Sequence, residues 1–331
     1  MREQQGLTLT RRHLLKGVVG GAAGLVLGAS RRVSAAAAQA VSGTTVPGNS
    51  AVQRLADNLF VLQLPGEANL VLQTSANGVV LVDGGSAKVA DALMKMIGEL
   101  SRGGQVQTLF NTHWHPEQTG LNEALGKAGT TIISHENTRL WLSTDITWSW
   151  NGQQFKRLPK VAQPNKTFYT TGQLDPPKER REGIPVDSIR YGYIPDAAHT
   201  DGDMYVYFPT QNVLVVGDAV SNQGWPVVDW QTGGWIGGIA GATQRLQTLA
   251  NADTRIVPAR GAVMNLAELK AQATMYATIY DRLTTLLNKG RGPSEAVAAK
   301  PTKEFDAQMG NPDEFVRRAF ESLWAYLSPD A

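Results

Sequence analysis

The densest group of residues that could do chemistry lies between Asn111 and Gly120, in the segment NTHWHPEQTG. In an extended segment residues i and i+2 point the same way, so His113 and His115 can reach one metal ion together. The segment follows an apolar stretch and precedes a predicted helix, which places it at a sheet edge open to solvent. Taken alone, a His-x-His pair also fits two ordinary surface histidines.

Three other segments place polar side chains at the ends of predicted strands. His199 precedes a strand in AHTDGD, Asp218 follows one in VVGDA, and Asp83 ends one in LVDGG. The chain has no cysteine, so a metal would need histidine and carboxylate ligands. Strand ends can meet at one edge of a sheet sandwich, which is typical of such a site. His135 begins a predicted helix and is interpreted as structural.

Short apolar strands, separated by glycine and proline turns, and periodic helices position these segments. Strands are predicted at 59–64, 68–74, 79–82, 108–111, 130–134, 188–194, 204–208, 213–216 and 254–257. Helices are predicted at 86–100, 121–125, 136–142, 240–249 and 266–287, and in the tail to 327. Residues 143–187 have no clear pattern. The order of strands followed by helices occurs twice, which predicts two packed sheets with helices outside.

The segments LVDGG, NTHWHPEQTG, HTDGD and VVGDA resemble the metallo-β-lactamase-fold metallohydrolases in order and approximate spacing, from about residue 58 to residue 261. The resemblance implies an α/β (α+β) fold, an αββα sandwich of two ββα halves, which agrees with the repeated order. We assign residues 58–290 to this domain, 41–57 to a leader, and 291–331 to a helical C-terminal extension packed on it. Because the fold hosts many hydrolases, it does not name a substrate.

The resemblance also implies a metal site, carried over residue by residue. The family's first metal is held by three histidines, which match His113, His115 and His199, so that site is complete. Asp218 matches a carboxylate that often bridges two metals. Asp83 is expected to act behind the ligands by accepting a hydrogen bond from backbone or from a ligand histidine, or else to be a simple turn residue.

The family's second metal site departs from its pattern in this chain. Where the family usually has an Asp-His pair, this sequence has Glu117 and Gln118, and where it usually has Pro-Gly-His-Gly, this sequence has PARG with Arg260. An arginine stays protonated and cannot donate a lone pair to a metal. The positive charge of Arg260 is therefore expected to replace part of the charge of a second metal ion beside Glu117 and Asp218.

These residues predict a mononuclear zinc hydrolase of an ester, thioester, amide or lactam that uses a metal-bound water, with about one Zn²⁺ per chain. Glu117 or Asp218 is the expected base or water-orienting group. Two alternatives stay open: a dinuclear site completed by Glu117 and Asp218, and a non-catalytic binding protein that has lost its second metal site.

Four tryptophans flank the ligand segments and are candidates for a substrate pocket. Trp114 lies within the His-x-His segment, and Trp225, Trp230 and Trp235 lie in a glycine-rich loop at 221–238. Loops over a rigid sheet edge are where substrate pockets form. Aromatic side chains on such a loop can equally be core anchors.

Residues 1–40 have the order of a bacterial export signal. The paired Arg11 and Arg12 precede an apolar run at 17–28 with five glycines, and a small-residue cleavage pattern follows at 38–40. The run is too short to span a bilayer, and its glycines argue against an amphipathic helix of the folded domain. The segment resembles a twin-arginine signal, so we expect a periplasmic or secreted protein with no stable membrane span after cleavage.

Composition and charge restrict the partners. The chain has 331 residues, 42% of them hydrophobic and 18% charged, which fits a globular protein. Its formal charge of +2 comes from the first forty residues, because beyond them acidic residues slightly outnumber basic ones. Such a body lacks the basic footprint of a nucleic-acid-binding protein, so we expect a small-molecule substrate.

Overall fold

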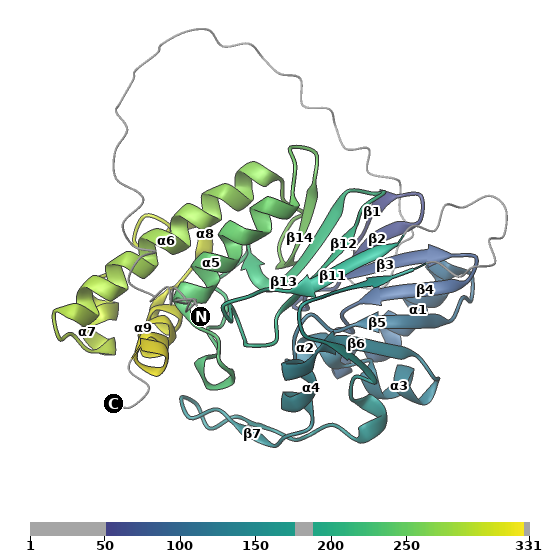
Figure 1. Ribbon diagram of the computed structural model, residues 1–331, viewed down its shortest axis with the longest axis horizontal. Coiled ribbons are helices and arrows are strands. Elements are labelled where there is room, and N and C mark those ends of the chain that lie inside the picture. Colours follow the sequence, from purple (N-terminus) through teal and green to yellow (C-terminus); the bar gives the residue numbers. More distant parts are fainter. Residues whose placement is uncertain (1–50, 176–187, 328–331) are drawn as a thin grey trace, which may run out of the picture. The chain divides into compact units, whose positions relative to one another are not determined.

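The computed structural model describes residues 51–175 and 188–327. Two β-sheets lie face to face between helices, as Figure 1 shows. The first sheet has the strand order β1-β2-β3-β4-β5-β6-β9, antiparallel from β1 to β4 and parallel from β4 to β9. Its strands are β1 (Ala51–Ala56), β2 (Leu59–Gln63), β3 (Leu70–Ser75), β4 (Gly78–Val82), β5 (Val106–Phe110), β6 (Thr131–His135) and β9 (Lys166–Phe168).

The second sheet has the order β10-β11-β12-β13-β14 and is antiparallel except for the parallel pair of β13 and β14. Its strands are β10 (Thr171–Leu174), β11 (Ile189–Tyr193), β12 (Met204–Phe208), β13 (Val213–Ser221) and β14 (Arg255–Arg260). A short hairpin of β7 (Ile146–Thr147) and β8 (Gln154–Phe155) stands apart from both sheets.

Alternating side chains of the two sheets meet in a shared core. Val61 and Phe110 of the first sheet belong to the same buried cluster as Val206 and Val257 of the second. Because successive residues of a strand point to opposite faces, their neighbours pack outward against helices. Leu72 of β3 packs in this way with residues of α1 (Ala90–Ser101). The result is the αββα sandwich expected from the repeated order of strands and helices.

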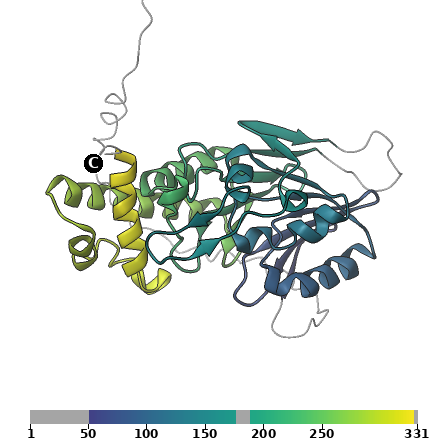
Figure 2. The ribbon, with the colours of Figure 1, turned by 90° about the horizontal axis from the view of Figure 1, so that it is seen from below.

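The outer face of the second sheet is covered by the C-terminal helices. α5 (Ile236–Leu246), α6 (Leu266–Asn288) and α9 (Asp313–Leu327) enclose a second buried cluster with β13 and β14. In Figure 2 these helices lie on one side of the sheets, and α1 lies on the other. α6 begins at a capping box, in which Asn265 and Glu268 satisfy each other's backbone N–H groups.

The remaining helices are short and connect these layers: α2 (Pro116–Thr119), α3 (Asn122–Lys127), α4 (Glu136–Leu142), α7 (Pro293–Ala298) and α8 (Asp306–Met309). α7 contacts α9, and α9 in turn contacts α5 and α6 of the preceding region. Within residues 51–175 and 188–327, no helix is both long and apolar enough to cross a membrane.

Three details differ from the expectations. Residues 51–56, assigned to the leader, form β1 and pair with β2, although only Leu55 is buried there. β13 extends beyond the predicted 213–216, and the unclear segment contains the short strands β7, β8, β9 and β10. The predicted export signal at 1–40 lies outside the described residues.

Candidate metal centre

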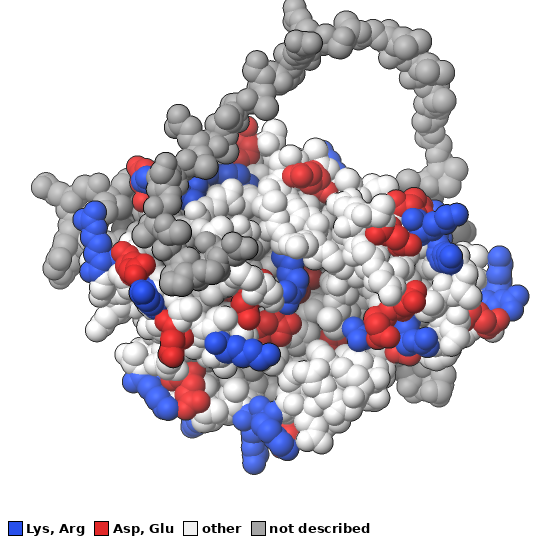
Figure 3. Space-filling model, turned by 180° about the vertical axis from the view of Figure 1, so that it is seen from behind, with Lys and Arg blue, Asp and Glu red and all other residues white. Residues whose placement is uncertain are grey.

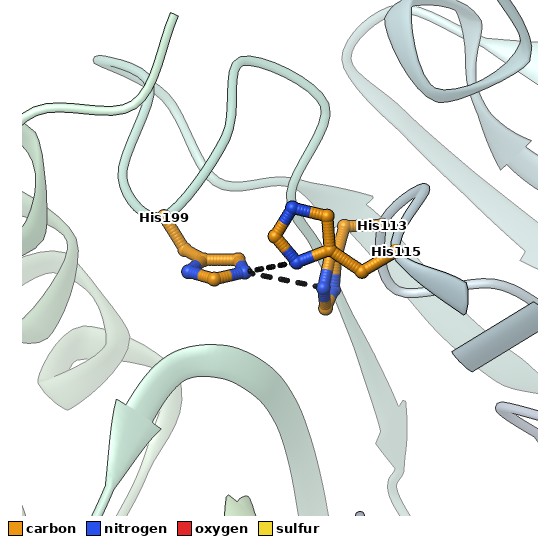
Figure 4. Close-up of side chains that lie close together, drawn as sticks. All are labelled: His113, His115 and His199. Carbon is orange, nitrogen blue, oxygen red and sulfur yellow. Dashed lines mark hydrogen bonds between the residues drawn. The ribbon is translucent and has the colours of Figure 1, made fainter. Parts of the chain in front are cut away.

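Three buried histidines from two loops converge at one point (Figure 4). His113 and His115 lie between β5 and α2, and His199 lies between β11 and β12. Each is 1% exposed. Nε2 of His199 lies 3.2 Å from Nε2 of His113 and 3.0 Å from Nδ1 of His115. The two segments that the sequence pointed to therefore meet.

The tautomers of His115 and His199 are fixed by the partner of the ring nitrogen that faces away from the other histidines. Nε2 of His115 lies 3.0 Å from the carboxylate of Asp229, and Nδ1 of His199 lies 2.5 Å from the carbonyl oxygen of Val227. Both partners accept hydrogen bonds, so both outer nitrogens donate. The inner nitrogens, Nδ1 of His115 and Nε2 of His199, then carry lone pairs.

His113 is held by a longer chain of the same kind. The hydroxyl of Thr112 lies 2.8 Å from Oδ2 of Asp83, to which it donates, and its oxygen lies 3.2 Å from Nδ1 of His113. Because the hydroxyl proton is used on Asp83, the oxygen accepts from His113. Asp83 also accepts the backbone N–H of Thr112 at 2.8 Å, in agreement with its predicted place behind the ligands.

This donor set fits a divalent metal ion. The inner nitrogen of His199 lies 3.2 Å from that of His113 and 3.0 Å from that of His115, so a cation between the rings would receive one lone pair from each ring in its neutral form. A metal-ligating histidine almost always donates its other ring N–H to a carboxylate, a carbonyl or water, as seen here for the outer nitrogens.

Asp218 lies within β13, whereas the sequence placed it after the strand. The pairing of β13 with β14 is irregular around Gly217, whose φ is +54°. A Cβ at that position would lie 2.8 Å from the side chain of Thr112, so only glycine fits without a shift. Beyond it, Oδ2 of Asp218 lies 3.5 Å from Nε2 of His113 and accepts a hydrogen bond of 2.8 Å from Gln118.

Gln118, Glu117 and Arg260 lie around Asp218, where the family pattern has second-metal ligands. Gln118 is fully buried, and its Oε1 has no hydrogen-bond partner among the residues described. Nη2 of Arg260 lies 4.0 Å from Oε1 of Glu117, and Nη1 lies 3.4 Å from the carbonyl oxygen of Gly66. Both charged side chains are about a third exposed, 36% for Arg260 and 33% for Glu117.

Burial and charge shift the pKa values in this centre. Burial, and then the charge of Glu117, raise the pKa of Asp218 to about 6, while Arg260 opposes the rise. Burial also raises the pKa of Asp83 to about 8, against the hydrogen bonds from Thr112. Burial and the neighbouring histidines hold the pKa of His113 well below its usual range, so this ring is neutral, as a metal ligand must be.

Asp229 was not among the residues identified from the sequence. Its Oδ2 accepts from His115 and, at 2.6 Å, from the hydroxyl of Thr232, which in turn accepts from the indole N–H of Trp114 at 3.0 Å. Burial lowers the pKa of His115, but the hydrogen bond to Asp229 and the charges of Glu117, Asp229 and Asp218 together raise that pKa above its usual value. A more basic ring is a stronger ligand.

Asp203 fixes the third histidine through its backbone. Its Oδ2 accepts from the N–H of His199 at 2.6 Å and from that of Thr200 at 3.0 Å. Both acids lie three residues from a threonine, a spacing at which an aspartate can accept a backbone N–H. Asp229 accepts from the N–H of Thr232 at the start of a short 3-10 helix, and Asp203 accepts from the N–H of Thr200.

The tryptophans proposed for a pocket divide into two groups. Trp114 packs against His115, with ring centroids 4.5 Å apart, as does Trp148 of the β7–β8 hairpin at 5.4 Å. The other three contact the C-terminal helices and their connections, as expected for core anchors: Trp225 stacks on Phe315, Trp230 donates to Glu321 and Trp235 stacks on Tyr326.

His135 has a structural position, as predicted. Its Nδ1 accepts the backbone N–H of Asn137 and caps α4, and its ring stacks on Tyr193 at 4.3 Å. Neither contact involves the three converging histidines.

Comparison with protein families relates this geometry to known proteins. A family model described as the metallo-beta-lactamase superfamily matches residues 64–262, more than half of the chain. The match contains all three histidines together with Asp83, Asp218 and Arg260. No curated protein matches the chain in sequence.

Solved structures share the fold. A metallo-beta-lactamase from Pontibacter korlensis is 19% identical, with a TM-score of 0.52 over 69% of this chain and 99% of that one. The DIM-1 metallo-beta-lactamase is 16% identical, with a TM-score of 0.50 over 69% of this chain and 97% of that one. A double mutant of the sec-alkyl sulfatase PisA1 is 14% identical, with a TM-score of 0.60 over 85% of this chain and 51% of that one. At these identities the likeness shows the fold alone.

Proposed function

Because the chain belongs to the metallo-β-lactamase superfamily, we propose that it is a hydrolase that binds one zinc ion between His113, His115 and His199. The observation that carries the proposal is the outer partner of each ring. Thr112, Asp229 and Val227 accept from the outer nitrogens, so three lone pairs face one point. Three nitrogen ligands and an open fourth position are typical of catalytic zinc.

The side chains around Asp218 support one ion rather than two. A second ion would need ligands where Gln118 and Arg260 lie. Gln118 donates an amide N–H to Asp218 and keeps only its amide oxygen as a weak donor of lone pairs, and the guanidinium of Arg260 offers no lone pair. A dinuclear centre would have to rely on Asp218, Glu117 and that amide oxygen, without any further imidazole and with a fixed positive charge 4.0 Å from Glu117.

The reaction we propose is hydrolysis of an ester, thioester, amide or lactam bond. The bound zinc ion supplies Lewis acidity that polarises the scissile group and acidifies water. Asp218 lies against His113 and is oriented by Gln118, so it is placed to accept a proton from the attacking water. Water adds to the carbonyl carbon, the bond to the leaving group breaks, and the leaving group takes up the proton. Glu117, partly exposed, is the second candidate base.

A small-molecule substrate is the partner that fits best. The structures with the same fold are titled as a metallo-beta-lactamase and a sec-alkyl sulfatase, enzyme types that act on small molecules. Basic and acidic side chains are interspersed on the face shown in Figure 3, which favours a small molecule over nucleic acid.

A non-catalytic binding protein is the second candidate, and Gln118 and Arg260 favour it because they replace ligands used by the two-metal hydrolases. One experiment separates the two functions. Purified chain is stripped of metal, reloaded with Zn²⁺, and assayed on a panel of esters, thioesters and lactams. The hydrolase must show zinc-dependent turnover that His113→Ala abolishes and His135→Ala retains, whereas the binding protein shows metal uptake without turnover.

We also propose export by a twin-arginine route, on the basis of residues 1–40. Replacing Arg11 and Arg12 by lysine should leave the full-length chain unprocessed in the cytoplasm of a bacterium with that route. Processing and export of the double variant at the wild-type level would indicate the general secretory route instead.

A further inference from the structure

We propose that Arg260 binds an anionic group of the substrate, a carboxylate, sulfate or phosphate, beside the metal centre. The inference deepens the proposed hydrolase function, on which it rests, by assigning a substrate class. It depends on three features of Arg260: its unused donors, its position and its partial exposure.

The guanidinium of Arg260 uses little of its hydrogen-bonding capacity within the protein. It has five N–H donors, yet its interactions with described residues are one hydrogen bond of 3.4 Å to Gly66 and an ion pair of 4.0 Å to Glu117. Charge-assisted hydrogen bonds are typically 2.7–2.9 Å long. Both contacts are therefore loose, and 36% of the side chain remains exposed to a ligand.

Two arginines near other strands and helices, Arg255 and Arg282, use their donors on the protein. Arg255, at the opposite end of β14, donates to the carbonyl oxygens of Leu55 and Gln211 and so joins three segments. Arg282 forms a two-pronged pair with Glu304 and also donates to Pro301. Neither leaves its planar fork open, whereas Arg260 has only the two long contacts to Gly66 and Glu117.

The position of Arg260 directs these donors to the reaction site. It ends β14 and pairs there with Ser221, which lies three residues after Asp218 on the adjacent strand. Its guanidinium lies 4.0 Å from Glu117, the chain neighbour of Gln118, and Gln118 donates a hydrogen bond of 2.8 Å to Asp218. An anion bound by this fork would lie on the Asp218 side of the three histidines.

The chemistry of the fork defines the ligand class. The planar guanidinium matches two oxygens of a carboxylate, sulfate or phosphate in a two-pronged arrangement and carries a positive charge. Glu117 is the competing anion inside the protein. Because its contact is 4.0 Å long and its side chain is a third exposed, an incoming anion can replace it without opening the core.

Anion binding by the zinc-loaded chain tests the proposal without any turnover. Sulfate and acetate are titrated by calorimetry into wild type, Arg260→Gln and Glu117→Gln. We expect Arg260→Gln to weaken binding about 10- to 100-fold, the loss of a charge-assisted pair, and Glu117→Gln to tighten it. Arg245→Gln, which removes an exposed arginine paired with Asp196, should leave binding unchanged. Equal binding by wild type and Arg260→Gln, or no binding by wild type, would overturn the proposal.

A pair of esters with the same leaving group tests the substrate class. The 4-nitrophenyl esters of acetic acid and of succinic acid differ by one carboxylate. Wild type should prefer the succinate ester in kcat/KM, Arg260→Gln should lose that preference, and Arg260→Lys should retain part of it. A preference unchanged in Arg260→Gln refutes the role of Arg260. If neither ester is hydrolysed, the substrate panel decides on the hydrolase function, and the anion titration alone decides on Arg260.

Discussion

The centre has two sides that differ in how tightly their side chains are held. On the histidine side every ring is 1% exposed, and each outer nitrogen has an acceptor. On the opposite side Arg260 and Glu117 are about a third exposed and 4.0 Å apart, and the buried amide oxygen of Gln118 has no partner in the described ranges. The histidine side is built to hold an ion. The arginine side holds charged groups that remain partly exposed.

The largest expected effect is loss of the metal when one inner nitrogen is removed. His199→Ala should lower zinc affinity by at least about 100-fold, because one of three protein ligands is gone and its partners remain buried. Competition with a chromophoric chelator measures the affinity. His135→Ala is the control, since His135 caps α4 and contacts none of the three rings. Equal zinc affinity in His199→Ala and wild type would exclude His199 as a ligand.

The opposite side predicts a pH-dependent stability of the metal-free chain. Burial raises the pKa of Asp218 to about 6, above its usual 3.8. The folded state therefore binds a proton more tightly than the unfolded state, so the metal-free chain loses stability as the pH rises from about 4 through 6. Asp218→Asn removes this loss and should stabilise the metal-free chain at pH 7 by up to about 3 kcal/mol.

Urea unfolding of wild type and Asp218→Asn at pH 4 and pH 7 measures this difference. The gain should vanish near pH 4, and the exposed control Asp253→Asn should change stability little at either pH. A destabilised Asp218→Asn chain at pH 7 would mean that the carboxylate is stabilised as an anion without metal, contrary to its burial.

A smaller loss of zinc affinity is expected when an acceptor of an outer histidine nitrogen is changed. Asp229→Asn keeps the shape but removes the charge that makes His115 more basic, so zinc affinity should fall about 10- to 100-fold. Asp201→Asn is a matched control, because the carboxylate of Asp201 accepts a hydrogen bond from Trp141 and, among the described residues, bonds to none of the three histidines. Equal losses in the two variants would indicate a general effect of the loops and not one transmitted through His115.

The sequence predicted those features of the two sides of the centre that depend on the local spacing of residues. The two-residue period placed His113 and His115 on one side of a strand end, and apolar runs marked most strands. The outer acceptors were harder to find, because Asp229 is 114 positions from His115 in the chain and lies in a glycine-rich loop without a periodic pattern. β1 was missed because Leu55 is its only buried residue. The position of Asp218 inside β13 depends on a left-handed Gly217, which strand propensity does not reveal.

The zinc content of the purified chain tests the difference between the two sides most directly. Elemental analysis after dialysis against a metal-free buffer should give one zinc per chain for wild type and none for His113→Ala. The Gln118→His and Arg260→His double variant restores two imidazoles and should take up a second equivalent. Two tightly held ions in wild type would contradict the account, because Gln118 and Arg260 would then not have closed the second site.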